Sequence, residues 1–191
     1  MAVGLPFASM GKLHAAIDDD LRAWIGAQRM FFVATAPSGD GGHVNCSPKG
    51  GDPLVVLGPH EVAWIDRVGS GIETIAHLRQ NGRICVMLCA FEGAPRIVRL
   101  HGRGEVVTKQ HARFAELRAR FPGRELGTRS IVRVDVTRIG DSCGFGVPLY
   151  RHEGERDQMG KWCDKKGAAG IDSYVREKNA LSIDGLPGFP D

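Results

Sequence analysis

The sequence of 191 residues has no apolar run close to the roughly 20 residues that a helix needs to span a bilayer. Its first residues, MAVGLPFASMGKLH, lack the charged start and the long apolar segment of a signal peptide. Lysine and arginine are spread along the chain and form no basic block, so the net charge of +3 does not indicate nucleic-acid binding. We therefore expect a cytoplasmic protein that binds neither membranes nor nucleic acid.

The cysteines indicate neither a disulfide framework nor a zinc site. There are five of them, an odd number, and no two form a CxxC pair. Cys143 lies in the glycine-rich loop SCGFGVP, where its thiol could contact a bound molecule or could simply pack as a small hydrophobic group. The chain is long enough to form a hydrophobic core of its own, and we expect a single domain over residues 1–191.

Short strands separated by turn residues dominate the remainder of the sequence. The segments rich in strand-forming residues are RMFFVATA, LVVLG, VAWID, RICVMLCAF, RIVRLHGRGEVV and IVRVDVTRI. Helical periodicity is found over residues 12–26 and 110–121, and short polar helices are expected within a C-terminal extension, 141–191, that otherwise consists of loops. About six strands with few helices predict a mainly β (α+β) fold, an antiparallel barrel with peripheral helices.

Residues 61–84 join a strand, a glycine-containing turn and a helix. After Gly69-Ser70-Gly71, the apolar residues Ile72, Ile75 and Leu78 recur at helical spacing. The first turn of such a helix has free N–H groups and the positive end of the helix dipole, and the hydroxyl groups of Ser70 and Thr74 are nearby. The segment could hold a phosphate group, or it could be a capped helix that follows a tight turn.

Two further segments carry candidate polar groups. Pro48 cannot donate a hydrogen bond to a sheet, so the chain is expected to leave the sheet at residues 47–51, at an edge or a bulge. The amine of Lys49 would then lie near a ligand or on an exposed turn. Arg99 shares a polar strand face with His101, and it either binds an anion or lies on a solvated barrel surface. His43, His77 and His101 are possible proton donors without an evident acidic partner.

These segments together resemble a known family. The order of SPKGGD, DRVGSGIETIAHLRQNGRICVMLCAF, RIVRLHGRGEVV and SCGFGVP is similar to that in the FMN-binding split-barrel family of the pyridoxamine 5′-phosphate oxidases, and in particular to a divergent bacterial branch of it. The resemblance covers roughly residues 30–107. It implies an antiparallel split β-barrel, FMN as the cofactor, and a homodimer with the cofactor at the interface.

The resemblance also implies which residues contact FMN. The flavin strand of the family, which ends in a lysine, falls on residues 44–49, and further contacts fall on the end of the next strand, on the loop and helix start, and on the strand 96–107. The cofactor-binding residues so implied are Asn45, Cys46, Ser47, Pro48, Lys49, Ile65, Asp66, Ser70, Gly71, Thr74 and Arg99. The resemblance identifies no catalytic residue and no metal site.

The sequence departs from the pyridoxamine enzymes at positions that matter for phosphate binding. Where that family has an arginine at the start of the flavin strand, this chain has Val44, and where it has Arg-Lys after the loop, this chain has Gly71-Ile72. The substrate arginines are also missing from residues 154–179. We therefore predict an FMN-dependent oxidoreductase that acts on another small organic substrate or on reduced nicotinamide. The alternative is a protein that binds a flavin, a deazaflavin or haem without turnover.

Overall fold

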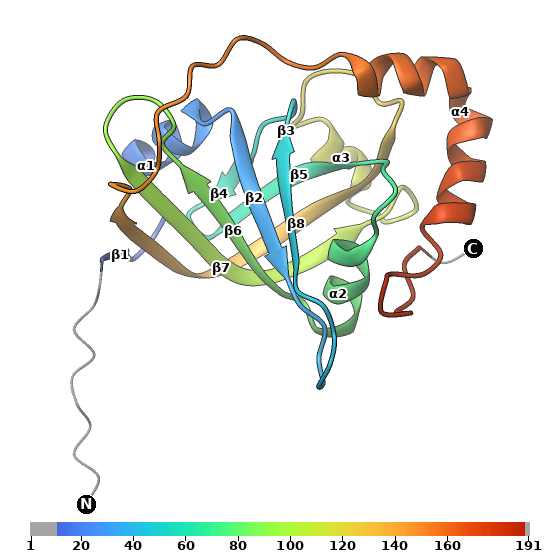
Figure 1. Cartoon of the computed structure of the whole chain (residues 1–191), viewed down its shortest axis with the longest axis horizontal. Helices are drawn as coiled ribbons and strands as arrows, with labels where there is room; N and C mark the ends of the chain where they lie inside the picture. Colours follow the sequence, from blue (N-terminus) through green and yellow to red (C-terminus); the bar gives the residue numbers. More distant parts are fainter. Residues whose placement is uncertain (1–10, 190–191) are drawn as a thin grey trace, which may run out of the picture.

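The computed structural model describes residues 11–189, so residues 1–10 and 190–191, which the single-domain prediction includes, lie outside the described residues. The described chain forms one eight-stranded antiparallel sheet in the order β3-β2-β6-β7-β8-β5-β4, and β1 also pairs with β8. Four helices lie around this sheet (Figure 1). The predicted mainly β (α+β) class, an antiparallel barrel with peripheral helices, is confirmed.

The bounds of the elements are as follows. The strands are β1 (Lys12–His14), β2 (Met30–Thr35), β3 (Asn45–Gly50), β4 (Val55–Gly58), β5 (Glu61–Arg67), β6 (Arg83–Cys89), β7 (Arg96–Val107) and β8 (Thr128–Cys143). The helices are α1 (Asp19–Ala27), α2 (Glu73–Asn81), α3 (Phe114–Arg118) and α4 (Gln158–Lys178).

Alternating apolar residues of the strands build the core. Val86, Val98 and Val132 are fully buried, as are their neighbours two residues further along the strands. Phe31 of β2 meets Trp64 of β5 edge to face, with ring centroids 5.8 Å apart. Each fully buried side chain of this size stabilises the fold by about 1.5–3 kcal/mol, so the period-two pattern determines which sheet face points inward.

Helix α2 begins directly after the glycine-containing turn, as the sequence predicts. Its apolar residues Ile75 and Leu78 are buried against the sheet. Gly82 ends the helix in the left-handed conformation, with φ of 69°, and its N–H donates to the carbonyl of Leu78 at 2.9 Å. Gly104 of β7 lets Leu78 approach closely, since a Cβ atom at this glycine would lie 2.7 Å from the Leu78 side chain.

The prediction of a helix over residues 12–26 was wrong for residues 12–18. Residues 12–14 form β1 instead, where His14 Nε2 also donates a hydrogen bond to the Asp141 carboxylate at 3.0 Å. Helix α1 begins only at Asp19, because the Asp18 carboxylate accepts from the Leu21 N–H at 2.8 Å and so caps the first turn.

Two other predicted segments differ in length from what the structure shows. The helix expected over residues 110–121 is confined to α3, five residues long. The chain does not leave the sheet at Pro48, because β3 continues through Gly50. The expected position at an edge is nevertheless observed, because β3 is the terminal strand in the sheet order, where proline is tolerated.

Beyond β8 the chain runs over one edge of the sheet and enters α4, which lies at the opposite end of the molecule from β1 (Figure 1). Gly167, with φ of 65°, interrupts α4 and divides it into two helical segments. Cys163 and Ile171 of α4 pack against Val68 of the body. None of the helices within residues 11–189 is long and apolar enough to cross a membrane.

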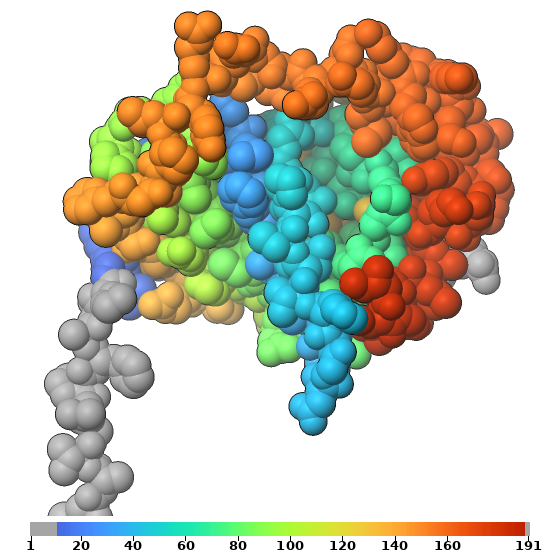
Figure 2. All heavy atoms as spheres, in the orientation of Figure 1, coloured from blue at the N-terminus to red at the C-terminus, as the bar shows by residue number. Residues whose placement is uncertain are grey.

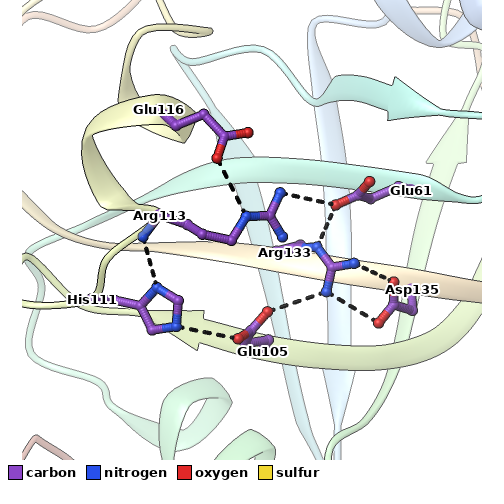
Figure 3. Close-up of polar contacts among 7 residues, drawn as sticks. All are labelled: Glu61, Glu105, His111, Arg113, Glu116, Arg133 and Asp135. Atoms are coloured by element: carbon purple, nitrogen blue, oxygen red, sulfur yellow. Dashed lines mark hydrogen bonds and ion pairs between the residues drawn. The ribbon is translucent and has the colours of Figure 1, made fainter.

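A network of charges fastens the segment around α3 to the sheet (Figure 3). Arg133 of β8 lies at its centre and pairs with Glu61, with Glu105 at 3.1 Å and with Asp135 at 2.6 Å. Burial alone would lower the pKa of Arg133, but the hydrogen bonds that it donates to Glu61 and Asp135 and the charges of these carboxylates outweigh it, and the net shift of the pKa is upward. Arg113, just before α3, reaches Glu61 at 3.9 Å and Glu116 at 3.5 Å.

Replacement of Arg133 by methionine tests this network. Its side chain is only 17% exposed, and its loss leaves three partly exposed carboxylates close together without the cation that separates them. We expect the free energy of unfolding, measured with urea, to fall by about 2 kcal/mol, between the values for exposed and for buried pairs. Arg113→Met is the control, since that side chain is 39% exposed and should cost about 0.5 kcal/mol. Equal losses in both variants would contradict the central role of Arg133.

Candidate functional site

A cavity of about 460 Å³ opens where the start of β3, the start of α2 and the C-terminal segment meet. It is lined by His43, Val44, Asn45, Cys46, Ser70, Gly71, Glu73 and Ile183. Figure 2 shows the chain near residue 45, in cyan, next to the C-terminal segment, in red. His43 joins these two segments, because its backbone N–H and its ring Nδ1 contact the Asp184 carboxylate at 2.9 and 2.6 Å.

Four of the predicted cofactor-binding residues line this cavity, namely Asn45, Cys46, Ser70 and Gly71. Two more are connected to them through Asn45. The Asn45 amide donates to the hydroxyl of Thr74 at 3.0 Å, and its oxygen accepts from the hydroxyl of Ser47 at 3.0 Å. The structure therefore brings six of the eleven predicted residues together at one place.

The other predicted residues are placed differently. Ile65 is buried in a cluster with Phe114, Leu117 and other apolar side chains. Asp66 is 1% exposed and fully engaged, since Arg129 donates to it at 2.7 and 3.1 Å and Ser130 at 3.2 Å. Neither side chain faces the cavity, so the predicted contacts of Ile65 and Asp66 with a cofactor stay predictions.

Pro48 and Arg99 lie on the other face of the sheet from the core. The strand register places them in one row, across Phe32 and Met87. Arg99 donates to the hydroxyl of Ser142 at 3.2 Å and forms no ion pair within residues 11–189. It helps to lower the pKa of the neighbouring His101, although burial is the larger cause and Arg138 also contributes.

Lys49 shares the inner face of β3 with Asn45 and Ser47. Burial lowers the pKa of its amine, an effect that Asp66 opposes and that Arg129 reinforces. Within the described residues the amine has no hydrogen bond or ion pair. A positively charged group that is largely desolvated and has no partner is suited to receive an anion.

Sequence reasoning missed Glu73, Ile183 and Asp184. Glu73 is in the first turn of α2, where the helix dipole favours a carboxylate, and it accepts a hydrogen bond from the Ile183 N–H at 3.4 Å. The acidic residue was visible in GIETIAH, but its proximity to the C-terminal segment depends on the tertiary fold. The hydrogen bonds from His43 hold the pKa of Asp184 below its ordinary value.

His77 connects to the cavity from the core. Its ring is 0% exposed, and its Nδ1 lies 3.0 Å from the hydroxyl of Thr35, which also accepts from the Asn45 amide at 3.3 Å. Its Nε2 is buried without a hydrogen-bond partner. Burial lowers the pKa of His77, more strongly than Asp184 and Glu73 raise it, so the ring is neutral near pH 7.

Comparisons with known proteins agree on one family. Residues 17–143 match the family model described as Pyridoxamine 5'-phosphate oxidase. The chain is 39% identical over 196 residues to the Pyridoxamine 5'-phosphate oxidase family protein ustO of Aspergillus flavus, a match that covers 94% of this chain and 78% of that protein.

Solved structures are similar at a lower level. HupZ from Group A Streptococcus is 20% identical, with 67% of this chain and 99% of that chain covered and a TM-score of 0.48. An FAD-binding protein from Mesorhizobium loti is 14% identical, with 66% of this chain and 94% of that chain covered and a TM-score of 0.46.

Because His77 is neutral in the folded chain, we can predict how the free energy of unfolding depends on pH. Its folded-state pKa lies below the ordinary value of 6.5, so the unfolded chain binds a proton that the folded chain resists. Stability should therefore fall as the pH decreases below 6.5, and His77→Asn should reduce this fall because asparagine keeps the contact with Thr35 but does not titrate.

The measurement is urea unfolding at about pH 7.5 and about pH 5.5, the interval in which histidine titrates. His60→Asn is the matched control, since His60 is exposed. An unchanged pH dependence in His77→Asn would show that the buried ring does not resist protonation.

Proposed function

This chain belongs to the pyridoxamine 5′-phosphate oxidase family, and we propose that it is an FMN-dependent oxidoreductase acting on a small organic substrate or on reduced nicotinamide. The observation that carries the proposal is the cavity at the start of α2. Its volume of about 460 Å³ lies within the range of small-molecule sites, and its walls come from segments that contact flavin in the resembling family.

The start of α2 fits the phosphate of FMN. No side chain caps the helix, so its first N–H groups have no side-chain partner at the positive end of the dipole. We also assign to the phosphate the amine of Lys49, which lies outside the cavity lining and has no hydrogen bond or ion pair within the described residues. Glu73 opposes an anion here, but the hydrogen bond from Ile183 holds one of its carboxylate oxygens at the C-terminal segment.

The wall at Asn45, beside the start of α2, offers neutral polar groups. Ser47, Asn45 and Thr74 form a chain of hydrogen bonds, which fixes their orientation before a ligand arrives. Such a wall is suited to the hydroxyl groups that lie between the phosphate and the ring of FMN. When bound, FMN supplies hydride acceptance and one-electron chemistry, and this chain supplies orientation, hydrogen bonds and exclusion of water.

We propose that the chain forms a homodimer through the outer sheet face next to this cavity. Cys46 lines the cavity, and the strand register continues from it through Ala34 and Cys85 to His101. Phe32 and Met87 on the same face are only half-buried in the single chain. Half-buried apolar side chains on a sheet face support a self-complementary interface, with the cofactor between the two protomers.

The visible spectrum of the purified protein tests the proposal. We expect added FMN to bind, its bands to bleach with a reduced nicotinamide or another organic donor, and air to restore them. Bound flavin that no donor reduces would favour the alternative of a non-catalytic flavin protein. A protein that ignores FMN would contradict the proposal, and sharp haem bands or retention of a deazaflavin would identify a different cofactor.

Two substitutions test the residues assigned to the phosphate. Lys49→Ala and Thr74→Ala should each weaken FMN binding by about tenfold, the effect of one charge-assisted or buried hydrogen bond. Titration of FMN fluorescence measures the dissociation constants. Lys109→Ala, at an exposed lysine in the turn after β7, is the control and should bind FMN like the original chain. Unchanged affinity in both variants would exclude this placement of the phosphate.

A further inference from the structure

Two buried side chains hold the loop before α2 by its carbonyl groups. The Asn179 amide donates to the carbonyl of Gly69 at 2.9 Å and to that of Ser70 at 3.4 Å. Arg129 donates through Nη1 to the carbonyl of Gly71 at 3.0 Å. Three consecutive carbonyl groups of the loop therefore point toward the same pair of side chains.

The orientation of the Asn179 side chain is determined by its partners. Its Oδ1 accepts from Arg129 Nη1 at 2.8 Å, and because a guanidinium group only donates, the oxygen must face it. The NH₂ group is then left for the loop. Asn179 is 0% exposed, and the Arg129 side chain is 6% exposed and bound to Asp66, so neither can turn toward water.

The chain beyond α4 fixes the backbone of Asn179. The Phe189 N–H donates to the carbonyl of Asn179 at 3.0 Å. Gly188 lies so close that a Cβ atom there would be 2.2 Å from this same carbonyl oxygen and 2.7 Å from Ile72. Residues 179–189 are thus packed against the loop and against the residue that begins α2.

Peptide geometry then directs the loop amides. In a trans peptide the N–H of one residue points opposite to the carbonyl of the residue before it, and no cis peptide occurs in residues 11–189. The N–H groups of Ser70, Gly71 and Ile72 must therefore point away from Asn179 and Arg129. The cavity lined by Ser70 and Gly71 lies on the side of the loop that faces away from Asn179 and Arg129. None of these three N–H groups donates a hydrogen bond to another described residue.

We propose that Asn179 is a positioning residue for a phosphate group. It holds the loop so that the unpartnered amides of Ser70, Gly71 and Ile72 point away from it, to the side where Ser70 and Gly71 line the cavity, and successive amides of this kind bind anions without an arginine in the loop. The amides take the place of the Arg-Lys pair whose absence separates this chain from the pyridoxamine enzymes. This inference rests on the proposed function for the identity of the phosphate compound, FMN, and extends the site to a residue outside the matched range 17–143.

The variant Asn179→Asp separates the two contacts of this side chain. Aspartate keeps an acceptor for Arg129, but it has no N–H to donate to Gly69 and Ser70. We expect the dissociation constant of FMN to rise roughly tenfold, the effect of one lost buried hydrogen bond. Riboflavin has the same ring and no phosphate, so its affinity should change little. Loss of affinity for both ligands alike would mean that the residue only supports the fold, and would overturn the proposal.

Asn81→Asp is the matched control. It introduces the same charge at the other end of α2, where Asn81 donates to the carbonyl of Ala36. It should leave the ratio of FMN to riboflavin affinity as in the original chain. If Asn179→Asp also leaves this ratio unchanged while FMN binds normally, the positioning role fails and the flavin proposal stands.

Inorganic phosphate provides a test that needs no flavin. In amide NMR spectra of the original chain, phosphate should shift the signals of Ser70, Gly71 and Ile72, and in Asn179→Asp these shifts should be lost. The same result in a chain that binds no flavin would support the amide site and contradict the proposed function. If phosphate moves none of the three signals in the original chain, the proposal is overturned.

Discussion

The buried ion pair between Asp66 and Arg129 is the interaction on which the site depends. Asp66 pairs with Ser130 across the sheet and Arg67 pairs with Thr128, so Arg129 is an extra residue in a β-bulge at the start of β8. Two charges this deeply buried are tolerated only when their hydrogen-bonding groups are satisfied. Asp66 accepts from Arg129 and Ser130, and the remaining donor of Arg129 serves the loop and Asn179.

Strand periodicity explains why a continuous run of predicted contacts is divided in the structure. Asn45, Ser47 and Lys49 face one side of β3, and Cys46 and Pro48 face the other. A ligand on one side of the sheet therefore meets only alternate side chains. Asn45 and Cys46 both line the cavity because it lies at the end of the strand, where the chain turns away. Residues further along β3 can contact a ligand only on one face of the sheet or at its edge.

Much of the fold could be predicted because it depends on local patterns. The alternation in RIVRLHGRGEVV and the spacing of Ile72, Ile75 and Leu78 express burial directly, so β7 and α2 were found. β1 was missed, since three residues become a strand only through pairing with β8, more than 120 residues away. The partner of Asp66 could not be predicted for the same reason. No residue near Asp66 in the sequence indicates Arg129, so a cofactor was an equally reasonable partner for this carboxylate.

Asp66, Arg129 and Asn179 come from three distant parts of the chain. Arg129 joins the other two, because it donates to the Asp66 carboxylate and to the Asn179 oxygen. Contacts this far apart in sequence form late, because closing long loops costs chain entropy before the contact is made. The loop before α2 can therefore acquire its final shape only after the end of the chain has folded back onto the sheet. A growing chain would therefore carry the strands of the barrel before this loop could take its final shape.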